Sequence, residues 1–130
     1  MAQLLCVVVA IEDLYVEFRS LLDQEKKEEC VDWALAKVAN NEIEVVQLYT
    51  DILTRTLNNI TCEDEDKWAC VWREHVKTGI VRTIIECCYP YVKTARDLRC
   101  GETRKGKALV LCPKEEYHEL GARVVADFFT

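Results

Sequence analysis

Apolar side chains recur with the spacing of amphipathic helices through the first two thirds of the chain. In Ile11–Leu22 they fall at positions i, i+3, i+4 and i+7, and similar stripes run through Lys26–Ala39 and Ile43–Asn59. A fourth helix is predicted over Asp64–Tyr89. Because short polar turns separate these segments, the pattern predicts a four-helix bundle that forms a cap domain over residues 1–93.

The fourth predicted helix carries the most informative pattern. At roughly 100° per residue, Trp68, Trp72, His75 and Gly79 fall on one stripe within about 60° of arc. The second half of this helix is apolar nearly all round, which predicts a central and buried position. Pro90 is expected to end the helix, since the residue before a proline is disfavoured in the helical conformation.

The C-terminal part of the chain changes character. Residues 94–106 lose the apolar period and gain charge, so they are expected to form a linker. Ala108–Cys112 then reads as a strand, Pro113 begins a turn, and Leu120–Phe129 reads as a helix. Strand, turn and helix over residues 107–130 predict the opening β-α unit of a parallel α/β domain, in which ligands bind past the carboxyl end of the strand.

Composition and charge narrow the class of protein. Half of the 130 residues are hydrophobic, enough for a proper core, and the net charge of −6 disfavours a nucleic-acid binder, which needs a basic face. The apolar run Met1–Ala10 is too short to span a bilayer, so no membrane is expected as a partner. We expect this run to begin the first helix and dock on the bundle, with a signal peptide as the alternative.

The eight cysteines are expected to be free thiols. Most of them fall inside apolar helical patterns, where a free cysteine behaves as a small hydrophobic residue, whereas disulfide scaffolds are short and rich in loops. The chain has no Cys-x-x-Cys pair, which removes the usual signature of a zinc site. This cysteine usage predicts that the protein resides in the cytoplasm, where thiols stay reduced.

His118, in the turn before the last helix, is a candidate metal ligand. Neutral imidazole binds transition metals well, and a carboxylate such as Glu116 can hold the ring in place through its other nitrogen. Gly121 would let the backbone approach a ligand closely. The alternative is a surface histidine at a helix N-terminus, where Glu115, Glu116 and Glu119 complement the helix dipole.

Glu74 and His75 form a second candidate site on the fourth predicted helix. A polar pair among aromatic and aliphatic neighbours must find hydrogen-bond partners or face a ligand cavity. The alternative is a satisfied core histidine with Glu74 at the bundle surface. Zinc held by Cys70, His75 and either Cys87 or Cys88 is a further alternative, although the spacing matches no standard site.

Taken together, the order of elements and the two histidine motifs resemble the cobalamin-binding module of methionine synthase, corrinoid methyl-carrier proteins and cobalamin photoreceptors. The family's Asp-x-His-x-x-Gly marker is similar to Glu116-x-His118-x-x-Gly121. The run Trp72-Arg73-Glu74-His75-Val76 resembles the Glu-His pair in the helical cap of the photoreceptor-like branch. The resemblance covers roughly residues 12–130 and implies a four-helix cap followed by a Rossmann-like domain.

This resemblance implies a role for each site residue. His118 would be the lower axial ligand to cobalt, supported by Glu116 and Gly121, and Glu74 and His75 would cover the upper face of the cofactor. The cap tryptophan of the family falls at a position where this chain has an aspartate, and the nearby tryptophans of the stripe are expected to take its place.

The implied function is a carrier or sensor module that binds methylcobalamin or adenosylcobalamin and presents it to a methyltransferase, or responds to light or cofactor level. We expect no catalysis by this chain alone, and weak or no cofactor binding, because the resemblance implies a Rossmann-like domain of which only the first unit is present. The alternative function is a helical dimerisation module, a homodimer in which both histidines are structural.

Overall fold

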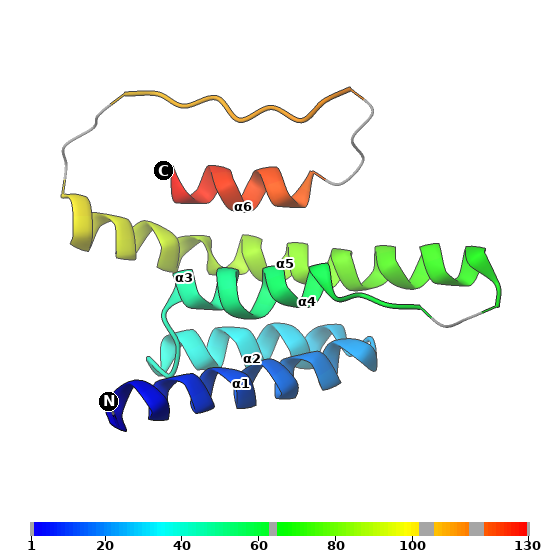
Figure 1. Cartoon of the computed structure of the whole chain (residues 1–130). Helices are drawn as coiled ribbons and strands as arrows, with labels where there is room; N and C mark the ends of the chain where they lie inside the picture. Colours follow the sequence, from blue (N-terminus) through cyan, green and yellow to red (C-terminus); the bar gives the residue numbers. More distant parts are fainter. Residues whose placement is uncertain (1, 63–64, 102–105, 115–118, 130) are drawn as a thin grey trace.

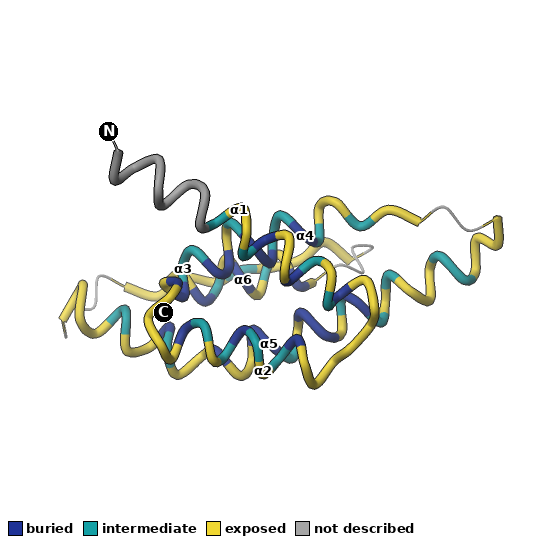
Figure 2. The backbone as a smooth tube through the Cα atoms, turned by 90° about the horizontal axis from the view of Figure 1, so that it is seen from below, coloured by how far each residue is buried: buried dark blue, intermediate teal, exposed yellow. Residues whose placement is uncertain are grey.

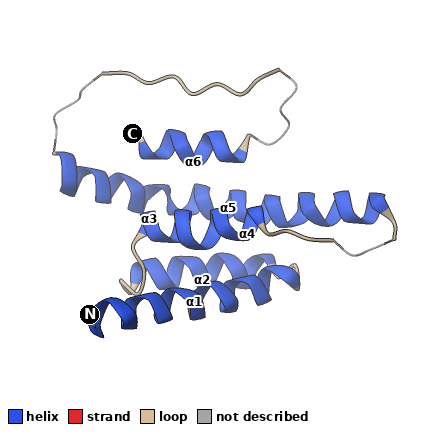
Figure 3. Cartoon of the chain, in the orientation of Figure 1, coloured by secondary structure: helices blue, strands red, loops and turns tan. Residues whose placement is uncertain are grey.

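The computed structural model describes residues 2–62, 65–101, 106–114 and 119–129, with the side chains described from residue 11 onward. The described residues form an all-helical fold, in which α3, η1 and α4 follow one another without a break as a single helix with a π-helical middle (Figure 3). The bounds are α1 (Ala2–Asp23), α2 (Lys27–Ala39), α3 (Val45–Gln47), η1 (Leu48–Thr54), α4 (Arg55–Asn58), α5 (Lys67–Cys100) and α6 (Leu120–Phe128).

The prediction of a mainly helical chain is confirmed. α2 packs against both α1 and α5, the continuous helix α3-η1-α4 packs against α1 and α5 as well, and α6 packs along α5 (Figure 1). Among the helices described, none offers an apolar stretch long enough to cross a bilayer.

The core consists of the side chains that the helical periods predict to face inward. Phe18 and Leu22 of α1, and Ile84 and Ile85 of α5, have almost no exposed surface. The largest side chains without exposed surface are Tyr49, Phe18, Leu22, Leu48, Ile52, Leu53, Ile84, Ile85 and Val81. Figure 2 shows the buried positions gathered where the helices face one another. The prediction that the second half of the long helix is central is therefore confirmed.

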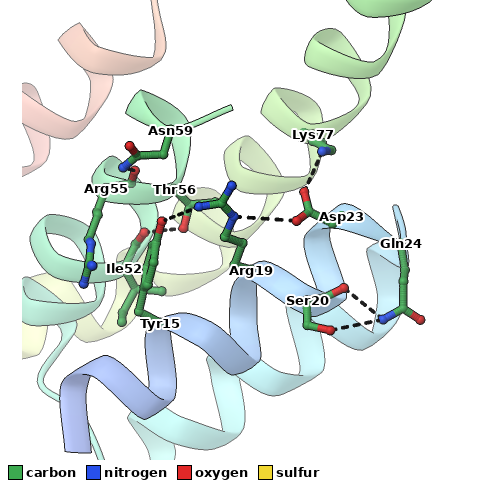
Figure 4. A network of polar contacts seen from close by, with 10 residues as sticks. All are labelled: Tyr15, Arg19, Ser20, Asp23, Gln24, Ile52, Arg55, Thr56, Asn59 and Lys77. Carbon is green, nitrogen blue, oxygen red and sulfur yellow. Dashed lines mark hydrogen bonds and ion pairs between the residues drawn. The ribbon is translucent and has the colours of Figure 1, made fainter. Parts of the chain in front are cut away.

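Polar contacts join α1 to α4 and to α5, and Figure 4 shows the residues on this side of the bundle. The guanidinium of Arg55 lies 3.8 Å from the ring centroid of Tyr15 and donates to both carboxylate oxygens of Glu12, at 2.6 and 3.0 Å. The Arg55 guanidinium lowers the pKa of the Glu12 carboxyl through this hydrogen bond. On α5, the nearly buried Lys77 donates to Asp23 at 2.7 Å, so the end of α1 is held against α5.

The predicted strand Ala108–Cys112 is wrong, and the structure has no β-α unit in the part of the chain that it describes. Residues 106–114 run in an extended path without secondary structure, between α5 and α6 in the sequence. A strand needs the hydrogen bonds of a second strand, and the described residues offer none. A short run of apolar side chains predicts an extended backbone but not a partner strand, and Leu109 and Leu111 are 81% and 75% exposed.

The predicted end of the fourth helix at Pro90 is also wrong. α5 continues through Pro90 to Cys100, so the predicted linker over 94–106 is helical in its first half. A proline inside a helix costs roughly 3 kcal/mol, through the lost hydrogen bond and the clash with the preceding turn. Pro90 lies on the exposed side, while Val92 is buried beyond it. Packing of this last part of α5 offsets the cost.

The cysteines divide into three groups, and one of them corrects the sequence prediction. Cys62 and Cys70 form a disulfide, with 5.5 Å between their Cα atoms, so the expectation of eight free thiols is wrong for this pair. The loop before α5 folds back beside the first turn of that helix, which the sequence pattern does not reveal. Cys30 and Cys88 are buried, as predicted, and burial raises their thiol pKa to about 11 and about 12. The other free cysteines described are exposed: Cys87, Cys100 and Cys112.

A buried polar contact attaches α6 to the bundle. The hydroxyl of Tyr49 in η1 donates to the carbonyl oxygen of Ile85 at 3.0 Å and lies 3.4 Å from Oδ2 of Asp127 in α6. Asp127 is only 4% exposed, and Nε of Arg123 donates to its other oxygen at 3.2 Å. Burial and the nearby carboxylate raise the pKa of Tyr49 far above its usual value, so its hydroxyl remains a donor.

We expect Tyr49→Phe to lower the free energy of unfolding by about 1–3 kcal/mol, because it leaves the buried Ile85 carbonyl and Asp127 carboxylate without this donor. Urea denaturation followed by circular dichroism measures the change. Tyr89→Phe is the matched control, since Tyr89 is exposed, and should stay within about 0.5 kcal/mol of the unsubstituted chain. Equal effects of the two substitutions would contradict the anchoring role of Tyr49.

Candidate functional site

The stripe of Trp68, Trp72, His75 and Gly79 begins on the first turns of α5, which project beyond the bundle (Figure 1). Trp68 is 82% and Trp72 is 70% exposed, and His75 and Gly79 are exposed as well. We call these four residues the aromatic face of α5. The loop that carries Cys62 lies against the first turn of α5 through the disulfide to Cys70, while the two tryptophan side chains stay exposed.

This placement corrects the expectation that Glu74 and His75 lie on a buried part of the helix. His75 is exposed and Glu74 is partly exposed, since the buried stretch of α5 begins only at Lys77 and Ile80. The alternative of a satisfied core histidine is wrong for the same reason. The apolar pattern that predicts burial belongs to the later turns of the helix.

The start of α5 is fixed by a capping side chain. The carboxylate of Asp66 accepts a hydrogen bond from the backbone N–H of Trp68 at 2.9 Å, as aspartate commonly does at a helix N-terminus. The disulfide between Cys62 and Cys70 ties the preceding loop to the same turn. Both contacts orient the beginning of the aromatic face.

An ion pair brings the start of α6 to this face. At 100° per residue, Arg82 continues the stripe of Trp68, Trp72 and His75, so that all of them lie within about 80° of arc. The guanidinium of Arg82 donates to Oε1 of Glu119, in the residue that precedes α6. Glu119 belongs to the second histidine motif and is thus held beside α5 about two turns beyond His75.

Two residues of the second motif, Glu116 and His118, lie outside the described residues. Gly121, in the first turn of α6, is described and is exposed. A Cβ added at Gly121 would meet no atom of the described chain within 4 Å. Packing in this part of the chain therefore does not require a glycine at this position.

A shallow groove lies beside the ion pair, between α5, the extended segment 106–114 and α6. Its volume is about 320 Å³, at the lower end of the range for small-molecule sites. Charged side chains of α5 and α6 flank a floor of small apolar ones, and the lining residues are Arg82, Glu86, Val110, Cys112, Glu119, Leu120, Ala122, Arg123 and Ala126. The groove can take part of a ligand but cannot enclose a large one.

The zinc alternative is not supported. Cys70 is bonded to Cys62, Cys88 is buried in the core, and Cys87 and His75 are exposed on α5. Within the described ranges, no group of three or more histidine, cysteine, aspartate or glutamate side chains is placed to hold a metal ion. The predicted cobalt ligand His118 is not among these residues.

Sequence reasoning missed two members of the site. Arg82 follows His75 by seven residues and therefore belongs to the same stripe, a signal that was present in the sequence. The pairing of Cys62 with Cys70 had no such signal, because it depends on the path of the loop between them.

Comparisons with known proteins identify no family for this chain. No family model matches the chain, and no curated protein or solved structure is significantly similar to it. The site therefore depends on the geometry of this chain's own residues.

We expect the fluorescence of Trp68 and Trp72 to be that of solvent-exposed indoles, with red-shifted emission and strong quenching by acrylamide. The double variant Trp68→Phe/Trp72→Phe should keep the free energy of unfolding within about 0.5 kcal/mol, because both side chains lie outside the core. Trp33→Phe is the control: Trp33 is partly buried, with its ring centroid 5.3 Å from that of Phe18, and this substitution should cost roughly 1 kcal/mol. A larger loss in the double variant than in the control would show that the aromatic face is covered in solution.

Proposed function

We propose that this chain is part of a cobalamin-binding carrier or sensor module, in which the aromatic face of α5 and the start of α6 lie on the two sides of one corrinoid site. The ion pair between Arg82 and Glu119 carries the proposal. It joins the helix of the Glu74-His75 motif to the turn of the Glu116-His118-Gly121 motif, two segments that are far apart in the sequence.

The side chains along the face suit a large, flat, partly apolar ligand. The rings of Trp68 and Trp72 are exposed and one helical turn apart, which makes an apolar surface larger than a single side chain. Exposed aromatic surface of this kind commonly marks a ligand or partner site. The open space at Gly121 supports close approach of the backbone to such a ligand.

Methylcobalamin or adenosylcobalamin, when bound, would supply a cobalt-carbon bond for methyl transfer or light sensing. By the resemblance of the sequence motifs, His118 supported by Glu116 would ligate cobalt from below, and Glu74, His75 and one of the two tryptophans would shield the upper face. A methyltransferase is the proposed partner of a carrier, and the cytoplasm the proposed compartment. The chain itself supplies binding and shielding and no catalytic step.

Affinity should be weak for this chain by itself. The groove beside Arg82 and Glu119 is small, and residues 106–114 form no sheet that could enclose a cofactor. The aromatic face is open to solvent on the side away from the bundle. Most of the ligand surface would therefore remain in water.

Titration with hydroxocobalamin, followed by visible absorption, tests the site. Trp68→Ala/Trp72→Ala should weaken binding roughly tenfold, because each lost aromatic contact is worth about 0.5–1.5 kcal/mol. His118→Ala should change the absorption spectrum of the bound corrinoid, since it removes the proposed cobalt ligand. Trp33→Phe, in α2 and packed against the core, should leave both affinity and spectrum unchanged.

The titration has two outcomes that would reject the proposal. One is a bound corrinoid whose spectrum is the same with and without His118. The other is an affinity that is unaffected by loss of both tryptophans while the control behaves as expected.

One observation favours a second candidate function, a dimerisation module in which a second copy of this chain is the partner. The backbone of residues 106–114 is extended, makes no ladder, and carries Leu109 and Leu111 on its exposed side. Such an edge is a ready template for pairing with another strand. Two copies could pair their edges and cover the leucines together.

In this second reading, light scattering after gel filtration should give the mass of a dimer at micromolar concentration. Leu109→Asp/Leu111→Asp should shift it to the monomer mass, because two charges would be placed in the paired edge. Leu98→Asp is the matched control, since Leu98 is 83% exposed near the C-terminal end of α5 and lies outside the segment 106–114. A monomeric unsubstituted chain, or dimers that persist in the double variant, would reject the dimerisation module.

A further inference from the structure

The disulfide between Cys62 and Cys70 lies away from the core, at the first turn of α5 and on the side of that helix opposite the aromatic face. Cys62 is in the loop after α4, and Cys70 is in the first turn of α5, between Trp68 and Trp72 in the sequence. The buried part of α5 begins at Lys77, almost two turns further on. The bridge therefore restrains the backbone at the start of the aromatic face, and it takes no part in the packing of the bundle.

The first turn of α5 lies outside the core. Its backbone is held by the Asp66 cap at 2.9 Å and by the bond from the N–H of Cys70 to the carbonyl of Asp66 at 3.1 Å. The side chains of Lys67 and Trp68 are exposed. Helix ends with few buried contacts open at low free energy, so a covalent link at this point has a large local effect.

The bridge is accessible to a thiol reagent. Cys62 is exposed and Cys70 is partly exposed, and only eight positions separate them. Exposed disulfides are commonly the labile and regulatory ones, and a short loop gains the least stabilisation from its closure. The chain otherwise holds free thiols at each described cysteine, which is the usage of a reducing compartment, where a disulfide is normally transient.

We propose that Cys62 and Cys70 are a thiol–disulfide exchange site for a dithiol reductant, and that their oxidation state sets the order of the aromatic face. The thiolate of the dithiol attacks Sγ of Cys62, a mixed disulfide forms, and Cys70 leaves as a thiolate that takes up a proton. The second thiol of the reductant then attacks the reductant's own sulfur in the mixed disulfide. The reductant leaves as an internal disulfide, and Cys62 is released as a thiolate that takes up a proton. Two electrons and two protons pass to the chain, and the first turn of α5 loses its covalent link.

Hydrogen–deuterium exchange with mass spectrometry tests the proposal on the full chain. Dithiothreitol should speed amide exchange in residues 67–72 roughly tenfold or more, and leave residues 80–92 unchanged because those turns are buried in the core. Cys62→Ser should show the fast exchange without reductant. Cys100→Ser/Cys112→Ser is the matched control, since both residues are exposed free thiols, and should exchange as the oxidised chain does.

Alkylation of the intact protein before reduction should label neither Cys62 nor Cys70, and should label both after dithiothreitol treatment. Labelling of the two residues without reductant would overturn the proposal. So would equal exchange in residues 67–72 in the oxidised chain, the reduced chain and Cys62→Ser.

The consequence for a ligand rests on the proposed corrinoid site and is tested separately. Cys62→Ser/Cys70→Ser, in thiol-free buffer, should bind hydroxocobalamin several-fold more weakly than the oxidised chain. Faster exchange together with no corrinoid binding in any form would reject the proposed function and retain the exchange site. Corrinoid binding of equal affinity in both forms would overturn the link between the bridge and the aromatic face.

Discussion

Burial of the middle of α5 is the constraint on which the rest of the structure depends. Val81, Ile84, Ile85 and Cys88 have no exposed surface, and α5 packs against α1, α2 and α3 through this region. Apolar surface removed from water stabilises a fold by about 25 cal/mol per Å², so a helix buried over several turns dominates the core. The other helices take their positions around it.

The same constraint leaves the start of α5 outside the bundle. α5 has 34 residues and α2 has 13, so the first turns of α5 extend past their neighbours, while Arg99 in its last turn still pairs with Glu44 before α3. Trp68 and Trp72 are exposed for this reason. The helix tolerates Pro90 because Val92, which follows it, still packs in the core. An exposed aromatic surface thus arises from a difference in helix length, with no special backbone geometry.

The position of α6 follows from a second, smaller buried contact. Tyr49 donates to the carbonyl of Ile85 and lies beside Asp127, so a polar group of α6 is satisfied inside the bundle. An unpaired carboxylate in that place would be costly, and α6 is therefore held in one register along α5. That register brings Glu119, the residue before α6, to Arg82 of α5.

The sequence by itself determined the helices and their inward faces, because the apolar period is a local property of each segment. It also determined the candidate residues Trp68, Trp72 and His75 as members of one stripe, which follows from helix geometry alone. Only the tertiary structure decided that this stripe is exposed, that the segment 106–114 has no strand to pair with, and that Cys62 bonds to Cys70. These features depend on which segments come together in space, and a local pattern of side chains carries no information about a partner that is distant along the chain.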